Sequence, residues 1–188
     1  MKMRKTKCLF PDGINTEGIV SFKRVWAMPN GRTFSIPPIK TFVENALFNG
    51  AYVVDPFANE CKYGTVTNDL NPEYDTTYCM DALEFLKLLP DDSADIILYD
   101  PPYSITQATT LYKSYGKEKL EVSVNNMKYW ALCKDNIAHI VKRGGIVLSF
   151  GWNTNGCGKN RGFVMTEILD VHHGGSKNDT LCCKEVKL

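Results

Sequence analysis

Four aspartates in the middle of the chain each follow a short apolar or β-rich segment. They are Asp55, Asp69, Asp81 and Asp100. An apolar run that ends at a chain breaker is typical of a buried strand. The carboxyl ends of neighbouring strands in an open α/β sheet meet at one edge, where ligands bind. The spacing therefore predicts a single ligand site to which successive strand ends contribute carboxylates.

The clearest of these segments is residues 94–103, Ala-Asp-Ile-Ile-Leu-Tyr-Asp-Pro-Pro-Tyr. Pro101 has no N–H and Pro102 restricts the residue before it, so the predicted strand stops there. An exocyclic amine of a nucleobase is a weak nucleophile, and acceptors for its N–H atoms return electron density to nitrogen. Asp100 and the Pro101 carbonyl are such acceptors, and Tyr103 could stack on a base turned out of its helix. The alternative is a turn that only ends a strand.

Asp-Pro-Pro-Tyr after an apolar strand resembles the catalytic motif of S-adenosylmethionine-dependent methyltransferases that act on exocyclic amino groups of nucleobases. The N6-adenine DNA methyltransferases are the group it most resembles. The resemblance runs over residues 26–188 and is strongest from 51 to 103. It implies a Rossmann-like class I methyltransferase sheet of about seven strands, with helices on both faces and a C-terminal antiparallel hairpin. It also implies S-adenosylmethionine as cofactor, adenine N6 in DNA as methyl acceptor, and as catalytic residues Asp100, Pro101, Pro102 and Tyr103.

The resemblance extends to segments expected to hold the cofactor. Residues 51–59 end in Asp-Pro-Phe-Ala-Asn and resemble the first cofactor motif, in which a glycine-rich turn lets the backbone approach the cofactor. Here residues 59–61, Asn-Glu-Cys, stand where Gly-x-Gly is expected, and asparagine tolerates left-handed dihedrals better than most residues. The implied cofactor-binding residues are Ser35, Ile36, Asp55, Pro56, Phe57, Ala58, Asn59, Asp69, Asp81 and Ala82.

Three parts of this expected cofactor site have different roles. Asp69 ends a β-rich segment, where a carboxylate could accept hydrogen bonds from the two ribose hydroxyls. Asp81 resembles the acid that binds the adenine amino group of the cofactor, and it also suits the N-cap of a helix that starts at Ala82. Ser35 and Ile36 belong to a segment that similar enzymes place against the methionine end of the cofactor, and a plain packing role is the alternative.

The other segments carry predictions of secondary structure. Glu44 lies three residues after Thr41, as in a capping box, and residues 37–38, Pro-Pro, are expected to keep the chain extended before that helix. Apolar residues at helical spacing predict the longest helix, which Gly144 ends. The predicted elements are a short strand at 18–25, an extended piece at 33–36, a helix from Thr41 to Gly50, helices at 82–89 and 126–143, and strands at 145–150, 163–171 and 180–186.

Residues 104–125 are polar and show no strong hydrophobic period, so we expect a loop there. Basic and aromatic side chains alternate within it, which suits contact with nucleic acid beside the catalytic strand. A surface loop without that role is the alternative. The net charge of the whole chain is only +1, whereas a free-standing nucleic-acid binder is usually more basic. We therefore expect weak affinity for DNA unless a partner contributes.

The bulk properties predict one catalytic domain over residues 1–188, with 1–25 as a lead-in segment. No apolar run reaches the length of a membrane span, and the basic start lacks the apolar segment of a signal peptide. The 7 cysteines are odd in number and form no C-x-x-C pair, which predicts a reduced, cytoplasmic protein without a zinc site. A bacterial or phage-infected cell is the expected setting.

The sequence also leaves alternatives open. We see no separate target-recognition domain, so sequence specificity would come from short loops, a homodimer or a specificity partner. A second hypothesis keeps the methyl-transfer chemistry but takes ribosomal RNA as the substrate, with guanine N2 or adenine N6 as the methyl acceptor. The third reading is a non-catalytic partner subunit of a methyltransferase, supported only by the missing glycines after Ala58.

Overall fold

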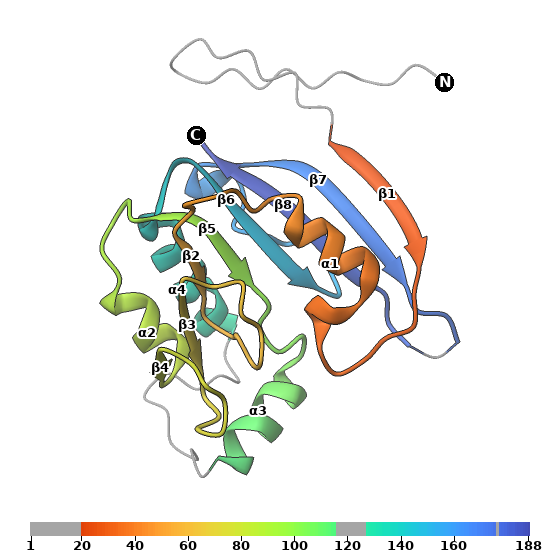
Figure 1. The fold of residues 1–188 in the computed structure, drawn as a ribbon, viewed down its shortest axis with the longest axis horizontal. Helices are drawn as coiled ribbons and strands as arrows, with labels where there is room; N and C mark the ends of the chain where they lie inside the picture. Colours follow the sequence, from red (N-terminus) through yellow and green to blue (C-terminus); the bar gives the residue numbers. More distant parts are fainter. Residues whose placement is uncertain (1–19, 116–126, 176) are drawn as a thin grey trace.

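The computed structural model describes residues 20–115, 127–175 and 177–188. These residues form one eight-stranded sheet in the order β1-β7-β8-β6-β5-β2-β3-β4 (Figure 1). The strands are β1 Ser21–Trp26, β2 Val53–Asp55, β3 Val66–Asp69, β4 Tyr78–Cys79, β5 Ala94–Tyr99, β6 Val141–Gly151, β7 Phe163–His172 and β8 Thr180–Lys187. The helices are α1 Pro37–Glu44, α2 Ala82–Leu88, α3 Ile105–Ser114 and α4 Met127–Ile140, with short 3-10 turns η1 Thr33–Ser35 and η2 Lys159–Arg161.

The strand directions confirm the predicted fold class. Strand β8 pairs antiparallel with both β6 and β7, and the other pairings are parallel. The predicted C-terminal hairpin is therefore β7–β8. The predicted short strand near the start of the chain is β1, which adds an eighth strand beside β7. All strands except β8 consequently present their carboxyl ends at one edge of the sheet.

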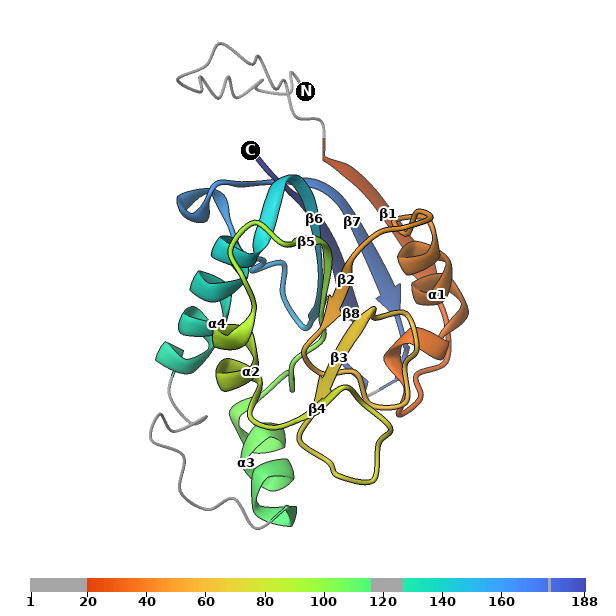
Figure 2. The ribbon, with the colours of Figure 1, turned by 60° about the vertical axis from the view of Figure 1, so that its left-hand side comes forward.

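The core lies on both faces of the sheet because the central strand β5 is buried on both sides. Ile97 and Tyr99 belong to the cluster that includes α2 and α4, whereas Ile96 and Leu98 belong to the cluster that includes α1. A strand covered on both faces is apolar throughout rather than alternating. Figure 2 shows α2 and α4 on one side of the sheet and α1 on the other. The predicted covering of both faces is thus confirmed.

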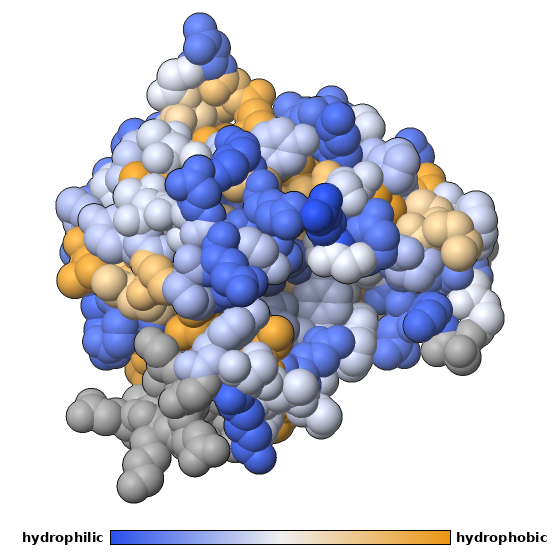
Figure 3. All heavy atoms as spheres, turned by 60° about the horizontal axis from the view of Figure 1, so that its bottom comes forward, coloured by the Kyte–Doolittle hydropathy of each residue, from blue (hydrophilic) through white to orange (hydrophobic). Residues whose placement is uncertain are grey.

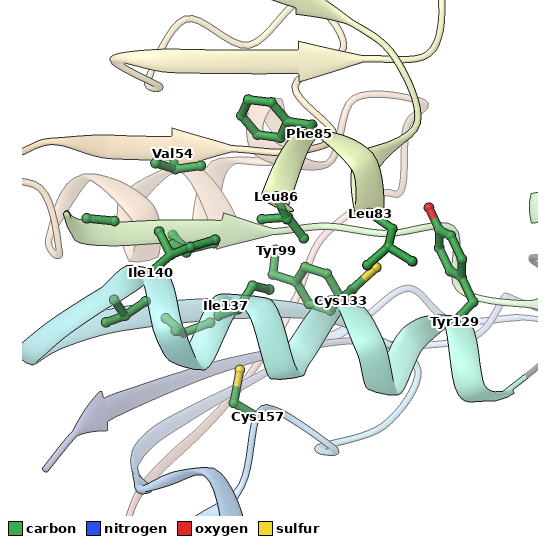
Figure 4. Packing of buried hydrophobic residues seen from close by; sticks show 14 of the residues in the cluster. Val54, Leu83, Phe85, Leu86, Tyr99, Tyr129, Cys133, Ile137, Ile140 and Cys157 are labelled. Atoms are coloured by element: carbon green, nitrogen blue, oxygen red, sulfur yellow. The ribbon is translucent and has the colours of Figure 1, made fainter. Parts of the chain in front are cut away.

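The long helix α4 supplies much of one core layer. Tyr129, Cys133, Ile137 and Ile140 are almost fully buried and recur at helical spacing, and Figure 4 shows them along one side of α4 toward α2. The sequence predicted a helix to residue 143, which is wrong at its end. Val141 pairs with Ala94 of β5, so residues 141–143 belong to β6.

Several predictions for the segment before β2 are wrong, including the end of its helix, which lies at Glu44 rather than at Gly50. Helix α1 begins at Pro37, with prolines at its first two positions, where a missing N–H costs no helical hydrogen bond. The Thr41 hydroxyl donates to the Pro37 carbonyl at 3.1 Å inside this helix, so no capping box forms there. The piece expected to be extended is the turn η1, closed by the Ser35 N–H donating to the Arg32 carbonyl at 2.8 Å.

The loop expected after the Asp-Pro-Pro-Tyr motif contains helix α3. Ser104 caps this helix by accepting a hydrogen bond of 3.2 Å from the Gln107 N–H. Ala108 and Tyr112 are buried, one turn apart, and dock the helix on the protein. The rest of the predicted loop, residues 116–126, and the lead-in before residue 20 lie outside the described residues. Among the described residues, no helix is long and apolar enough to cross a membrane.

Candidate active site

The carboxyl edge of the sheet carries a cavity of about 650 Å³. Figure 3 looks onto this edge, where hydrophilic side chains surround a recessed surface. Most of the predicted site residues line the cavity, although they come from separate segments of the sequence. These lining residues, which belong to five separate segments, are Ser35, Pro56, Phe57, Ala58, Asn59, Asp69, Ala82, Asp100, Pro101, Pro102 and Tyr103. Ile36, Asp55 and Asp81 are not among the lining residues.

Asp100 and Tyr103 form a hydrogen-bonded pair just beyond β5. The Tyr103 hydroxyl donates to Oδ1 of Asp100 at 2.7 Å, and the Thr33 hydroxyl lies 3.5 Å from that of Tyr103. Burial raises the pKa of Asp100 to about 6, while hydrogen bonds from Tyr103 and Thr33 act in the opposite direction. At neutral pH Asp100 is therefore an ionised acceptor, and Oδ2 is not engaged by Tyr103.

The turn after β2 keeps its shape without the expected glycines. Asn59 adopts a left-handed backbone conformation with φ of 52°, which confirms that asparagine can stand at this position. Its N–H donates to Oδ2 of Asp69 at 2.8 Å, and its side-chain oxygen accepts from the Glu60 N–H at 2.7 Å. Oδ1 of Asp69 accepts from the Asn71 N–H at 2.9 Å. Asp69 is thus held at the cavity wall by two loops.

Asp55 is buried and does not line the cavity. Its side chain is 0% exposed, and Oδ1 accepts a hydrogen bond of 3.2 Å from the Phe57 N–H. Oδ2 is buried and has no hydrogen-bond partner within the described part of the chain. Burial raises the pKa of Asp55 well above its usual range, with the Phe57 N–H opposing that effect. The residue therefore shapes the turn through Oδ1, while Oδ2 stays buried in the protein.

Asp81 is directed into the protein. One carboxylate oxygen caps α2 by accepting from the Leu83 and Glu84 N–H groups. The other accepts from the hydroxyls of Tyr112 at 2.8 Å and Tyr129 at 2.9 Å. Four donors fill the acceptor sites of a carboxylate. The structure thus shows the predicted N-cap, and the predicted contact of Asp81 with adenine finds no support in this geometry.

Asn68 and an ion pair at the cavity were missed by sequence reasoning. The Asn68 amide donates to the carbonyls of Pro56 and Met80, both at 3.1 Å, and so joins the turn after β2 to the end of β4. Arg32 and Glu60 both line the cavity and form an ion pair of 2.6 Å between two loops. The sequence did carry one signal for Asn68, because it is a polar residue within a β-rich segment. No local pattern connected Arg32 to Glu60.

Comparisons with known proteins bear on the fold. No protein-family model matches the chain, and neither does any curated protein sequence. TrmN from Thermus thermophilus superposes with a TM-score of 0.52 at 15% identity, over 81% of this chain and 49% of that one. The chain has a methyltransferase fold. A candidate S-adenosylmethionine-dependent methyltransferase from Streptococcus mutans superposes with a TM-score of 0.50 at 14% identity, over 79% of this chain and 48% of that one.

Two other solved structures with this fold are matched over a larger share of their own length. The 1,6-didemethyltoxoflavin-N1-methyltransferase from Burkholderia thailandensis has a TM-score of 0.55 at 10% identity, over 80% of this chain and 76% of that one. A candidate rRNA-methylase from Clostridium thermocellum has a TM-score of 0.52 at 10% identity, over 85% of this chain and all of that one. By contrast, the chain spans about half the length of the first structures it matches. At such identities the similarity establishes the methyltransferase fold alone.

Proposed function

We propose that the chain binds S-adenosylmethionine and transfers a methyl group to the exocyclic N6 amine of adenine in DNA. The observation that carries this proposal is the shared cavity: Asp100 and Tyr103 line it together with Asn59 and Asp69. The motif suited to activating an amine and the turn suited to a nucleoside cofactor therefore face the same space. A volume of about 650 Å³ is in the usual range of small-molecule sites.

The residues around the cavity fit this cofactor. Each oxygen of Asp69 accepts one backbone hydrogen bond, which leaves acceptor capacity for two ribose hydroxyls. Ala58 and Ala82 are small residues that line the wall, so neither places a bulky side chain in the cavity. The Burkholderia enzyme was solved with S-adenosylhomocysteine bound, which supports a related ligand for this fold. When bound, the cofactor supplies an electrophilic methyl group on a sulfonium.

The chain's own part in the chemistry is to hold and polarise the amine. With a pKa of about 6, Asp100 is ionised at neutral pH and can accept an amine N–H at Oδ2. Pro101 lines the same cavity, and its carbonyl is the second acceptor that the motif offers. When the amine nitrogen forms its bond to the methyl carbon, the bond from that carbon to sulfur would break, and nitrogen would lose a proton that Asp100 accepts and passes to water. Tyr103 keeps the carboxylate oriented through its hydrogen bond to Oδ1.

Ribosomal RNA is the second candidate substrate. The match to the candidate rRNA-methylase covers all of that chain, which favours a small RNA-directed enzyme of similar extent. The same site chemistry serves guanine N2 or adenine N6 in RNA. The intact pair of Asp100 and Tyr103 argues against a non-catalytic partner subunit, since such a subunit has no chemical use for it.

A labelled transfer experiment distinguishes these possibilities. Purified protein would be incubated with methyl-labelled S-adenosylmethionine and separate pools of unmethylated DNA and unmodified ribosomal RNA. Nucleosides from each pool would then be analysed by mass spectrometry. N6-methyladenine from DNA is the expected product, whereas methylated guanine or adenine only from RNA would move the protein to the second candidate. Absence of cofactor binding in calorimetry would contradict the proposal and favour the non-catalytic reading.

A further inference from the structure

Trp152 contacts the ring of Tyr103 from the neighbouring strand. Their ring centroids lie 5.9 Å apart, with an angle of 74° between the planes. Trp152 follows the carboxyl end of β6, which runs parallel to β5, so both rings lie at the edge that carries the cavity. Trp152 is 40% exposed, whereas Tyr103 is partly buried against the core. The two rings are thus in edge-to-face contact, and the indole is the more exposed of the two.

The segment that carries Trp152 is anchored at both ends. On one side Gly151 pairs with Leu181 of β8. On the other side Glu185, which is 1% exposed, accepts hydrogen bonds from the Cys157 N–H at 2.6 Å and the Gly158 N–H at 2.9 Å. These anchors limit the conformations of the backbone at Trp152, so less conformational entropy is lost when a ligand stacks on it.

Glycine is required within this anchored loop. A side chain at Gly156 would overlap the carboxylate of Glu185, which the loop surrounds. Lys134 of α4 also donates to the Asn155 carbonyl, so the loop is held from the sheet and from the helix. Trp152 lies in this anchored segment, so its position is defined although its exposed side chain does not fill the core.

We propose that Trp152 binds an unpaired nucleobase of the substrate strand, by stacking beside the base presented to Asp100. This inference rests on the proposed function and adds a substrate contact to it. The Tyr103 hydroxyl is engaged with Asp100 at 2.7 Å, which fixes its ring and leaves the indole as the more exposed aromatic surface. Stacking tolerates every base and needs few phosphate contacts, which suits a chain of net charge +1.

Binding of a labelled single-stranded oligoadenylate, followed by fluorescence anisotropy without cofactor, tests this inference. The variants are Trp152→Ala, Trp152→Phe and Trp26→Ala. Trp26 is the matched control, because it is 63% exposed at the carboxyl end of β1, and β7 and β8 lie between β1 and β6. We expect Trp152→Ala to weaken binding roughly tenfold, Trp152→Phe to weaken it less, and Trp26→Ala to leave it unchanged.

Deoxyribose and ribose oligonucleotides form separate arms of the experiment. A Trp152-dependent affinity in either arm supports the inference, and the tighter arm identifies the nucleic acid. Wild-type affinity in Trp152→Ala, an equal loss in Trp26→Ala, or no binding by the wild type would overturn it. Because the assay contains no cofactor, failed methyl transfer would count against the proposed function alone. Transfer that persists while Trp152→Ala binds normally would remove only the role of Trp152.

Discussion

The hydroxyl of Tyr103 donates a hydrogen bond of 2.7 Å to the carboxylate of Asp100. The first and last residues of the Asp-Pro-Pro-Tyr motif are therefore in direct contact with each other. Burial favours the neutral form of Asp100, and the tyrosine hydroxyl favours the ionised form. The balance leaves a pKa of about 6, so the carboxylate is available at neutral pH.

Tyr103→Phe is expected to shift the pH dependence of methyl transfer. Phenylalanine keeps the ring but removes the donor, which raises the pKa of Asp100 above its present value of about 6. Asp100 must be ionised to accept an amine N–H, so the acidic limb of the kcat/KM profile should move to higher pH. The shift is obtained from the rates of wild type and variant, measured from about pH 5 to about pH 8, a range that includes this pKa. An unchanged acidic limb would contradict this role of Tyr103.

Asp100→Asn is expected to stabilise the folded protein at pH 8. A free aspartate has a pKa of about 3.9, so between roughly pH 4 and 6 the folded chain holds a proton that the unfolded chain has released. The contribution of Asp100 to stability therefore falls as pH rises through that window. Asparagine does not ionise, so it avoids this loss of stability, a gain of up to about 3 kcal/mol at pH 8 and little at pH 4.

Urea unfolding of the wild type and Asp100→Asn at both pH values measures this difference. Asp91→Asn is the control, because Asp91 is exposed and lies before β5 rather than after it. The control should change stability equally little at both pH values. If Asp100→Asn were instead less stable than the wild type at pH 8, the buried carboxylate would be stabilising, contrary to our account.

Asp69→Asn is expected to weaken S-adenosylmethionine binding by roughly 10- to 100-fold, because hydrogen bonds to a charged acceptor contribute about 1.5–3 kcal/mol each. The substitution keeps the size of the side chain and one of its acceptors. Isothermal calorimetry gives the dissociation constants. Asp75→Asn provides the comparison, since Asp75 is a fully exposed carboxylate paired with Lys62 on the same side of the fold. Equal affinity in both variants would remove Asp69 from the cofactor site.

Substitutions at Asn59 test the turn after β2. Asn59→Gly should preserve stability and cofactor affinity, whereas Asn59→Ala should cost about 1–2 kcal/mol because alanine is strained at positive φ. Asp92, with φ of 48°, is a second left-handed residue away from the cavity lining. Asp92→Ala should reduce stability without altering cofactor binding. Cofactor affinity that survives Asn59→Ala at wild-type strength would show that the turn does not approach the cofactor.

The strands and their terminal acids could be predicted from sequence because the central parallel strands are continuous apolar runs ended by breakers. Residues 94–103 show this most clearly. Helix α3 escaped this reasoning, since only Ala108 and Tyr112 on it are buried and no hydrophobic period emerges. Its signal was the spacing of Ser104 and Gln107, which matches a capping box.

The site was predictable only where its residues are local in sequence. Asp81 bonds to the hydroxyls of Tyr112 and Tyr129, which are 31 and 48 residues away, and no local pattern reveals such a contact. The contact between Trp152 and Tyr103 also joins residues that are distant in sequence, and it arises from the pairing of β5 with β6. Sequence patterns thus located the strand ends, and tertiary packing determined which side chains face the cavity.

The most direct test of the central claim is methyl transfer by wild type and Asp100→Ala, measured side by side. Each protein would receive methyl-labelled S-adenosylmethionine and unmethylated DNA, with ribosomal RNA in a parallel reaction, and the nucleosides would be identified by mass spectrometry. We predict labelled N6-methyladenine from the wild type and a loss of at least about 100-fold in Asp100→Ala, with cofactor affinity retained. Wild-type transfer by Asp100→Ala, or no labelled base from the wild type in either nucleic acid, would contradict the account.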